Sequence, residues 1–259
     1  MDKAVTEAAR RVLVGRRFIP ITGPVGAGVQ TVVQEVFLGA KLGSLDMIGE
    51  HNETLRPHAR RHLPLPIIHK DFFIHWRDGE SSQHFGIPLD TGPAASASVF
   101  CANAEDRLIF YGNEEMEYEG LTNAQKRTTV SRSDWATMGN GFKDVVAAIE
   151  KLIAAGQHGP YALALSPGLY TSLHREYGNT GLLEIEQIRR LATDGVYPSP
   201  MLDEPGAVLV STGEQNMDLV IAQDLVITYL ETFKMNYYLR VFEILALRIK
   251  RPEAICTIE

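Results

Sequence analysis

The chain has 259 residues, of which 45% are hydrophobic and 22% charged, enough to bury a sizeable core as one large domain or two small ones. Its formal net charge is −7 with acidic and basic residues interspersed, which argues against a dedicated nucleic-acid binder. No apolar run reaches the roughly 18 residues of a membrane span and no signal peptide is visible, and the two cysteines indicate reduced, buried thiols in a cytosolic chain.

The first 66 residues predict a helix, a strand and a projecting arm. Residues 2–14 place their apolar side chains on one side of an amphipathic helix that Gly15 ends, and residues 29–38 follow as a strand. Residues 41–66 are polar and contain Gly, Pro and His, and a structureless segment of this length is uncommon inside a compact domain. We therefore expect an extended two-stranded arm that packs on another chain.

The longest predicted helix covers residues 91–111 and follows a strand at 67–76. An Asp-Thr pair at its start offers a cap, Pro93 fits its first turn, and Gly112 stands where a helix usually ends. Twenty-one residues make a rod of roughly 30 Å. Small side chains line its N-terminal half, so we expect a sheet or another helix to approach it closely.

Residues 142–230 predict a compact α/β unit. Its helices are expected at 142–155, from Ser166 onward and at 183–191, and its strands at 161–165, 207–210, 218–222 and 225–230. Residues 237–250 then alternate as one strand, whose fourteen residues would span more than about 40 Å. A long helix against a long strand predicts an elongated molecule of mixed α/β class.

The sequence contains no motif that predicts catalysis. The glycine-rich stretch 23–28 is followed by Val29 and Gln30 rather than by the Lys and Ser/Thr of a phosphate-binding loop. Six of the eight histidines fall within residues 51–84, but Pro57 and the neighbouring arginines make them a poor zinc site. No GxSxG or HExxH pattern is present, so a structural protein is favoured over an enzyme.

Several blocks of the sequence, in order, resemble encapsulin shell proteins. They are GRRFIPITGPVGAG (15–28), KDFFIHWRD (70–78), EDRLIFYGN (105–113), GPYALALSPGLYTSLHR (159–175), NMDLVIAQD (216–224) and the C-terminal LRVFEILALRIKRPEAICTIE. The resemblance covers essentially the whole chain and implies the HK97-type capsid fold, with a peripheral domain, an extended arm (E-loop) and an axial domain. The domains expected are peripheral at 1–40, 67–141 (with the spine helix 91–111) and 231–259, the arm at 41–66 and axial at 142–230.

The resemblance further implies a groove that docks the targeting peptide of a cargo protein. The N-terminal helix and adjacent strands would form this groove, and Arg16, Ile19 and Pro20 match part of that region. Many relatives carry Asp where this chain has Pro20. Relatives also have a further segment before the position of Met1, which implies either a truncation or an unusual start, so cargo docking is a weaker expectation than shell formation.

Two more regions are implied by the resemblance. A loop would border a pore at a five-fold axis with a polar rim suited to small solutes; it consists of Tyr177, Gly178, Asn179, Thr180 and Gly181. Trp76 aligns with a tryptophan where some relatives hold a flavin. An ordinary apolar strand residue is the favoured interpretation of Trp76, so no cofactor, and no metal, is expected in the shell itself.

We therefore predict a self-assembling icosahedral shell protein of a nanocompartment in a bacterial or archaeal cytoplasm. Its partners would be further copies of itself and an enclosed cargo enzyme bearing a C-terminal targeting peptide, with no nucleic acid and no membrane. The family implies a ferritin-like protein or a dye-decolorising peroxidase as cargo, hence iron storage or oxidative-stress defence. Two alternatives stay open, a hydrolase such as a protease and a prophage capsid protein of the same fold.

Overall fold

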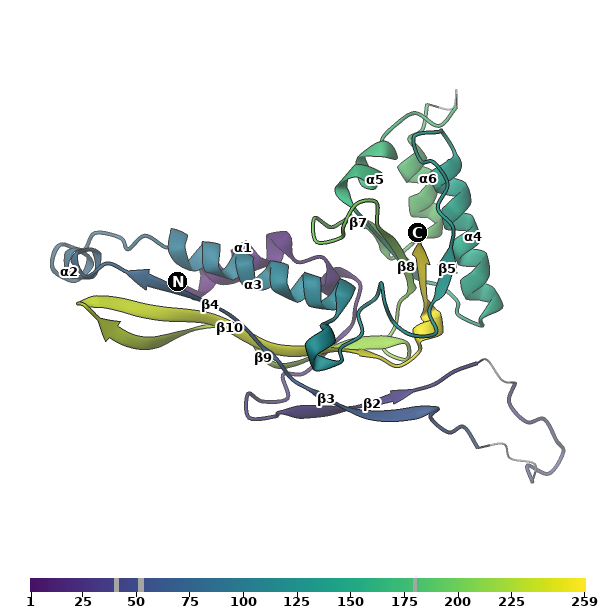
Figure 1. Ribbon diagram of the computed structural model, residues 1–259, viewed down its shortest axis with the longest axis horizontal. Coiled ribbons are helices and arrows are strands. Elements are labelled where there is room, and N and C mark those ends of the chain that lie inside the picture. Colours follow the sequence, from purple (N-terminus) through teal and green to yellow (C-terminus); the bar gives the residue numbers. More distant parts are fainter. Residues whose placement is uncertain (40–41, 51–53, 179–180) are drawn as a thin grey trace.

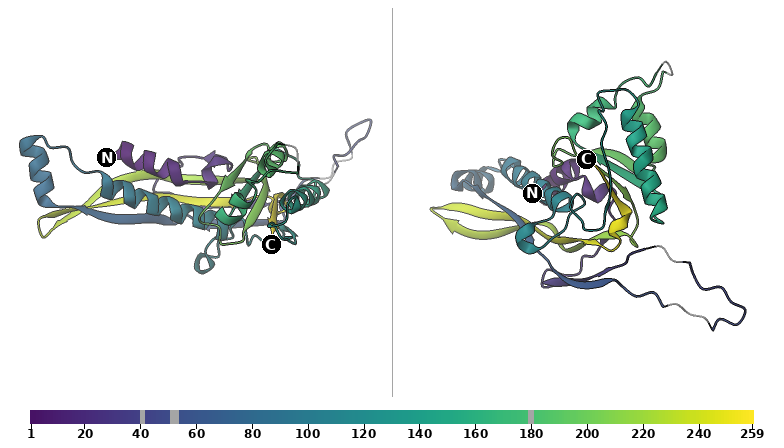
Figure 2. Two further views of the ribbon diagram at one scale, coloured as in Figure 1. Left: turned by 90° about the horizontal axis from the view of Figure 1, so that it is seen from above. Right: turned by 45° about the vertical axis from the view of Figure 1, so that its right-hand side comes forward.

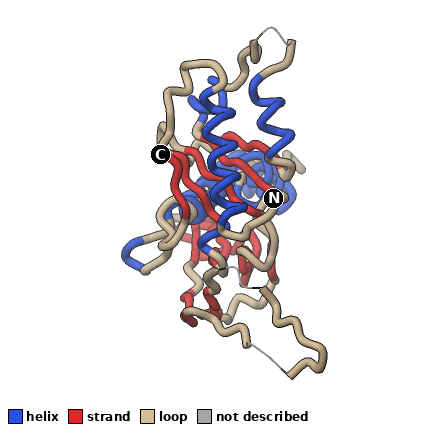
Figure 3. The backbone as a smooth tube through the Cα atoms, turned by 90° about the vertical axis from the view of Figure 1, so that its right-hand side faces the viewer, coloured by secondary structure: helices blue, strands red, loops and turns tan. Residues whose placement is uncertain are grey.

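The computed structural model describes residues 1–39, 42–50, 54–178 and 181–259 and shows an elongated molecule with three parts (Figure 1). A long sheet with helices on one face forms the first part. A second sheet flanked by helices stands at one end of it, and a two-stranded arm lies on the other side. Seen along the long axis, the helices of the second part and the arm extend in opposite directions (Figure 3).

The long sheet has four strands in the order β1 (Ile21–Thr22), β9 (Met217–Phe233), β10 (Asn236–Ile249) and β4 (Ile67–Ile74). β9 and β10 form an antiparallel hairpin of 17 and 14 residues, so the long strand predicted at 237–250 is confirmed. The two short strands predicted at 218–222 and 225–230 are wrong as separate elements. They form the single strand β9, because the polar pair Gln223-Asp224 lies at a register shift opposite β10 and does not end the strand.

Three helices accompany the long sheet, α1 (Asp2–Val12), α2 (Trp76–Phe85) and α3 (Gly92–Tyr111). α1 and α3 lie side by side on one face of the sheet, and α2 stands at its far end (Figure 2). The predicted helix 91–111 is confirmed as α3, and its small side chains allow the expected close approach. Buried Ala97 belongs to a cluster that also contains Val5 of α1 and Val241 of β10.

The second sheet has five strands in the order β5 (Thr128–Val130), β11 (Ile255–Ile258), β8 (Ala207–Ser211), β6 (Tyr161–Leu165) and β7 (Gly195–Pro198). Its helices are α4 (Asn140–Ala154), α5 (Pro167–Ser172) and α6 (Glu184–Leu191). The expected unit 142–230 therefore differs from the observed one at both ends. β5 and β11 join the sheet from outside that range, whereas β9 leaves it, because strand pairing connects segments that are distant in sequence.

At the base of the arm, β2 (Thr31–Val36) runs antiparallel to β3 (Ala59–Pro64). The two-stranded structure expected within 41–66 is thus shifted, since one of its strands precedes that range. Beyond the pair, apolar side chains stand almost fully in solvent: Leu42, Leu45, Met47, Ile48 and Leu55 are 67% to 101% exposed. Their own chain does not cover these side chains.

One core joins the long sheet to the second sheet. Fully buried Ile109 and Phe110, in the last turns of α3, pack in a cluster that contains Leu245 of β10 and Val208 of β8. The 3-10 helix η2 (Glu114–Met116) lies between α3 and β5, and the 3-10 helix η3 (Pro252–Ala254) lies between β10 and β11. Within the described segments, none of the helices combines the length and the apolar character that a membrane crossing requires.

Candidate functional site

A buried ion-pair cluster fastens the turn after α1 to the rest of the molecule. The turn is η1 (Gly15–Arg17), and the guanidinium of Arg16 extends from it between α3, β9 and β10. Its nitrogens donate hydrogen bonds of 2.7 Å to three carboxyl groups, those of Glu105 on α3, Asp224 on β9 and Glu243 on β10. We call these four residues the Arg16 cluster.

Burial determines the charge state of the Arg16 cluster. The side chains of Glu105 and Glu243 are 0% and 1% exposed, and an unpaired charge at such a place is costly. Burial and the charge of Glu105 raise the pKa of Glu243 to about 9, although Arg16 acts in the opposite direction. Glu243 is therefore protonated at neutral pH. Its Oε1 atom is buried and has no hydrogen-bond partner in the described part of the chain.

The neighbouring carboxyl group, that of Asp106, holds the backbone of the same turn. Its oxygens accept hydrogen bonds from the amides of Val14 and Gly15, each at 2.9 Å. Burial raises the pKa of Asp106 to about 6, although these two hydrogen bonds act to lower it. Position 15 has no room for a side chain, because a Cβ atom there would lie 2.5 Å from the Cδ1 atom of Ile109.

The three residues expected in a docking groove hold the N-terminal segment to the body of the chain. The guanidinium of Arg16 is taken up by the Arg16 cluster, and Ile19 is 3% exposed within the main core. The carbonyl of Pro20 accepts a hydrogen bond from the amide of Leu219, next to the pairing of β1 with β9. Within one chain the side chain of Ile19 is not on a surface that a peptide can reach, and the docking assignment stays a prediction.

The loop expected at a pore connects α5 to α6 and lies in a different part from the Arg16 cluster (Figure 1). Asn179 and Thr180 fall outside the described residues. Tyr177 packs its ring against that of Phe142, with centroids 6.0 Å apart. The amide of Gly178 donates to the sulfur of Met138 at 3.0 Å, and Gly181 has a positive φ of 71°. The contacts of Tyr177 and Gly178 hold the start of the loop, whose role at a pore stays a prediction.

Trp76 is the first residue of α2 and not a strand residue, so the favoured interpretation of its position was wrong. β4 ends at Ile74, and the ring of His75 then caps the helix by accepting from the amide of Arg77 at 3.3 Å. The backbone amide of Trp76 donates to Asn236, and the guanidinium of Arg77 lies 5.5 Å from the centre of its ring. One face of the indole is thus partly occupied, and flavin binding stays an untested prediction.

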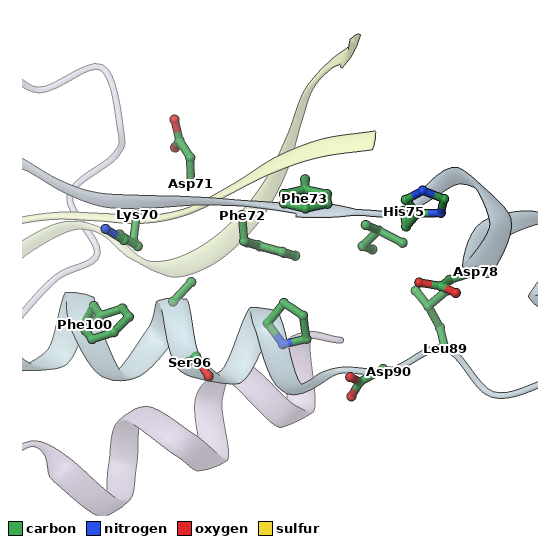
Figure 4. Close-up of a pocket in the computed structure, with 13 residues that line it drawn as sticks. Lys70, Asp71, Phe72, Phe73, His75, Asp78, Leu89, Asp90, Ser96 and Phe100 are labelled. Atoms are coloured by element: carbon green, nitrogen blue, oxygen red, sulfur yellow. The ribbon is translucent and has the colours of Figure 1, made fainter. Parts of the chain in front are cut away.

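An apolar cavity that the sequence did not reveal lies between β4 and the N-terminal half of α3 (Figure 4). Its volume is about 470 Å³, and its walls include Phe72 and Ile74 of β4 and Ala97 and Phe100 of α3. The small residues of α3 were the available signal, because a short side chain facing a strand leaves space as well as permitting close packing.

Comparison with known families gives one match that covers most of the chain. The family model described as an encapsulating protein for peroxidase matches residues 1–246. The chain is 50% identical to the type 1 encapsulin shell protein EncA of Myxococcus xanthus, covering 100% of this chain and 91% of that protein.

Two further relatives are fusion proteins. The chain is 40% identical to a diheme-cytochrome-encapsulin shell fusion protein of Kuenenia stuttgartiensis, over 100% of this chain and 71% of the relative. It is 22% identical to a ferritin-like-encapsulin shell fusion protein of Pyrococcus furiosus, over 80% of this chain and 56% of the relative.

Solved structures show the same fold. A virus-like particle from Pyrococcus furiosus superposes with a TM-score of 0.81 at 19% identity, over 100% of this chain and 97% of that one. The capsid of the myovirus XM1 superposes with a TM-score of 0.66 at 10% identity, over 92% and 88%. The mixed α/β capsid fold expected from the sequence is thereby confirmed.

We expect Arg16→Met to lower the free energy of unfolding by roughly 3–5 kcal/mol, because the buried carboxylate of Glu105 would lose its cation. Chemical denaturation followed by circular dichroism measures the change. Arg17→Met is the matched control, since Arg17 is exposed and its guanidinium donates to the carbonyl of Arg11. Equal losses in the two variants would show that the Arg16 cluster does not stabilise the fold.

We expect the stability of the unaltered chain to fall with rising pH in a way that Glu243→Gln removes. The folded-state pKa of Glu243, about 9, lies above its ordinary value of 4.5, so the folded chain binds this proton more tightly than the unfolded chain. The contribution is therefore complete below pH 4.5 and is lost as the pH rises towards 9. Unfolding temperatures measured across this range test it, and parallel pH profiles for both proteins would contradict it.

Proposed function

The chain belongs to the encapsulin family of shell proteins, and from this premise we propose that it encloses a cargo enzyme in a closed icosahedral nanocompartment built from many copies of itself. The observation that carries the proposal is the 50% identity to a type 1 encapsulin shell protein over the whole chain. The family consists of structural shell proteins, and the proposal assigns no catalytic residue.

The arm supports assembly because its apolar side chains need another surface. Leu45 and Met47 are 99% and 101% exposed, which leaves them no contact within their own chain. Burying a side chain of this size stabilises a contact by roughly 1.5–3 kcal/mol. Closed symmetry repeats each contact in every subunit, so modest contacts add to a stable shell.

We assign the three parts of the molecule to the domains of the capsid fold. The long sheet with α1 to α3 is the peripheral domain, and the sheet with α4 to α6 is the axial domain. The arm from β2 to β3 is the E-loop. Strand pairing supports this assignment, because β5 and β11 belong to the second sheet although they flank its other strands in sequence.

The comparisons support an oxidoreductase or iron-handling cargo. The family model is named for a peroxidase, and one fusion relative carries a ferritin-like part and another a diheme cytochrome. The proposed cargo is therefore a peroxidase or a ferritin-like protein with a targeting peptide, and the compartment would serve oxidative-stress defence or iron storage. The named relatives come from bacteria and an archaeon, and we place the compartment in the cytoplasm of such a cell.

A prophage capsid protein is the second candidate function, because the phage XM1 capsid has the same fold. Its identity to this chain is 10%, against 50% for the encapsulin shell protein, so the encapsulin function is favoured. None of the relatives named above is a hydrolase.

We expect the purified protein to elute as a megadalton particle and to show closed shells in electron micrographs. Replacing Leu45 and Ile48 by Glu should convert it to small species, because charges cannot be buried against a neighbouring copy. The same change at the exposed polar position Thr54 is the control and should leave the particle intact. A monomer from the unaltered chain would overturn the proposed function. Particles from the Leu45/Ile48 variant would overturn only the role of the arm.

We expect removal of Gly178–Gly181 to widen the pore and to increase the rate at which iodide quenches a dye trapped inside the shell. The reason is that this loop would form the polar rim through which small solutes pass. Asn179→Ser, which keeps the length of the loop, is the control. If shortened and full-length shells of equal size quenched at the same rate, the loop would not border the route of entry.

A further inference from the structure

The cavity between β4 and α3 has the size and the walls of a small-molecule site. Its volume of about 470 Å³ lies within the usual range of about 300–1,000 Å³ for such sites. Phe72 extends from β4 toward α3, and Phe100 of α3 lies across from the strand (Figure 4). Leu89 and Pro93 add to the apolar wall near the start of α3. Two aromatic rings in one wall favour a ligand with a flat apolar body.

The inner wall of the cavity is continuous with the core of the long sheet. Ala97 lines the cavity and is 2% exposed, and it belongs to the cluster against which Phe72 packs. Phe100, by contrast, is 56% exposed at the outer side. An apolar molecule in the cavity would therefore extend the core and cover Phe100, and the removal of this surface from water is the favourable term.

Two carboxylates stand at the end of the cavity near α2 (Figure 4). Asp78 lies in the first turn of α2, and Asp90 precedes α3, so two separate elements bring these exposed groups to one end. Asp90 accepts a hydrogen bond from the amide of Gly92 at 2.8 Å, and neither carboxylate has an ion-pair partner among the described side chains. Asp71 also lines the cavity, but Arg240 already donates to it at 2.6 Å.

The outer edge of β4 adds hydrogen-bond acceptors. β4 is the last strand in the order β1-β9-β10-β4, so one side of its backbone faces away from β10. Residues 70–75 all line the cavity although successive strand side chains point to opposite faces, so the backbone itself borders the cavity. An edge strand presents unpaired carbonyl groups, and an ammonium group has three donors and no acceptor. Two carboxylates and one carbonyl would satisfy such a group.

The opposite end of the cavity carries a positive charge. The ammonium group of Lys70 lies 5.4 Å from the centre of the Phe100 ring. A second cation on the ligand would be repelled there, so a molecule with a charge at each end fits poorly. Because one ammonium group faces two carboxylates without ion-pair partners, the cavity as a whole favours a ligand with a single positive charge.

We propose that this cavity binds a small molecule that has a flat apolar body and one primary ammonium group. The body would lie against Phe72 and Phe100, and the ammonium group would donate to Asp78, Asp90 and the edge of β4. Neither Arg16 nor Trp76 lines the cavity, and the site needs no enclosed partner. The inference is therefore independent of the proposed function.

Three naphthalene derivatives with the same apolar body test the proposal: naphthylethylamine, the neutral naphthylethanol and the anionic naphthylacetate. Equilibrium dialysis against assembled shells of verified size measures their binding. We expect the amine to bind about fivefold tighter than the alcohol, since it forms ion pairs with two exposed carboxylates, and tighter still than the acetate. Equal binding of amine and acetate would overturn the proposal.

A change in the apolar wall should affect the amine and the alcohol alike. Phe100→Ala should weaken the binding of each about tenfold, a loss of about 1.4 kcal/mol. Phe85→Ala is the matched control, because Phe85 is 79% exposed and does not line the cavity. Unchanged binding of both compounds to the Phe100→Ala shells would place them elsewhere and overturn the proposal.

A change in the charged end should affect the amine alone. The double change Asp78→Asn and Asp90→Asn should weaken the amine about fivefold and leave the alcohol unchanged. Glu80→Gln is the matched control, because Glu80 also belongs to α2, pairs with His84 and does not line the cavity. If Glu80→Gln weakened the amine as much, the acidic shell would attract any cation, and the proposal would be overturned.

The state of assembly separates this inference from the proposed function. Failure of the amine to bind well-formed shells would overturn this site and leave the proposed function unaffected. Binding to unassembled chains but not to shells would also overturn it, since a neighbouring copy would then cover the cavity. If the chain formed no shells, the proposed function would fail, and the same dialysis against the unassembled chain would test the site by itself.

Discussion

One guanidinium group holds the helical face of this molecule in place. Arg16 contacts carboxyl groups on α3, β9 and β10, which come from distant stretches of the chain. Buried charges are tolerated only when they are paired, so the N-terminal segment can dock in a single register. α1 itself buries few side chains, Val5 and Ala9 among them, and its position therefore depends on the turn that follows it.

Around this fixed centre, the chain leaves two surfaces incomplete. The arm holds apolar side chains in solvent, and the edge of β4 leaves backbone groups and a cavity open. Both features would be liabilities in a protein that works alone, because they favour association. In a shell protein built from many copies, a neighbouring copy can cover such surfaces.

The sequence predicted the long elements well because their signal is local. The alternation over 237–250 and the small residues of 91–111 each identify an element from its own residues. Sheet membership is not local: β11 joins the second sheet only through pairing with β5 and β8, and no periodicity in 255–258 shows this. The partners of Arg16 could not be predicted for the same reason, because the carboxyl groups to which it donates lie in segments that are distant in sequence.

The register shifts in the β9–β10 hairpin have a geometric consequence. They occur between Tyr238 and Leu239, between Phe242 and Ile244 and between Ile244 and Leu245, and the last two lie near the middle of the long strands. A bulge bends a strand and increases its local twist, so the two halves of the hairpin cannot lie in one plane. A bent subunit meets its neighbours at an angle. The radius at which a shell of such subunits closes would then depend on an irregularity of only a few residues.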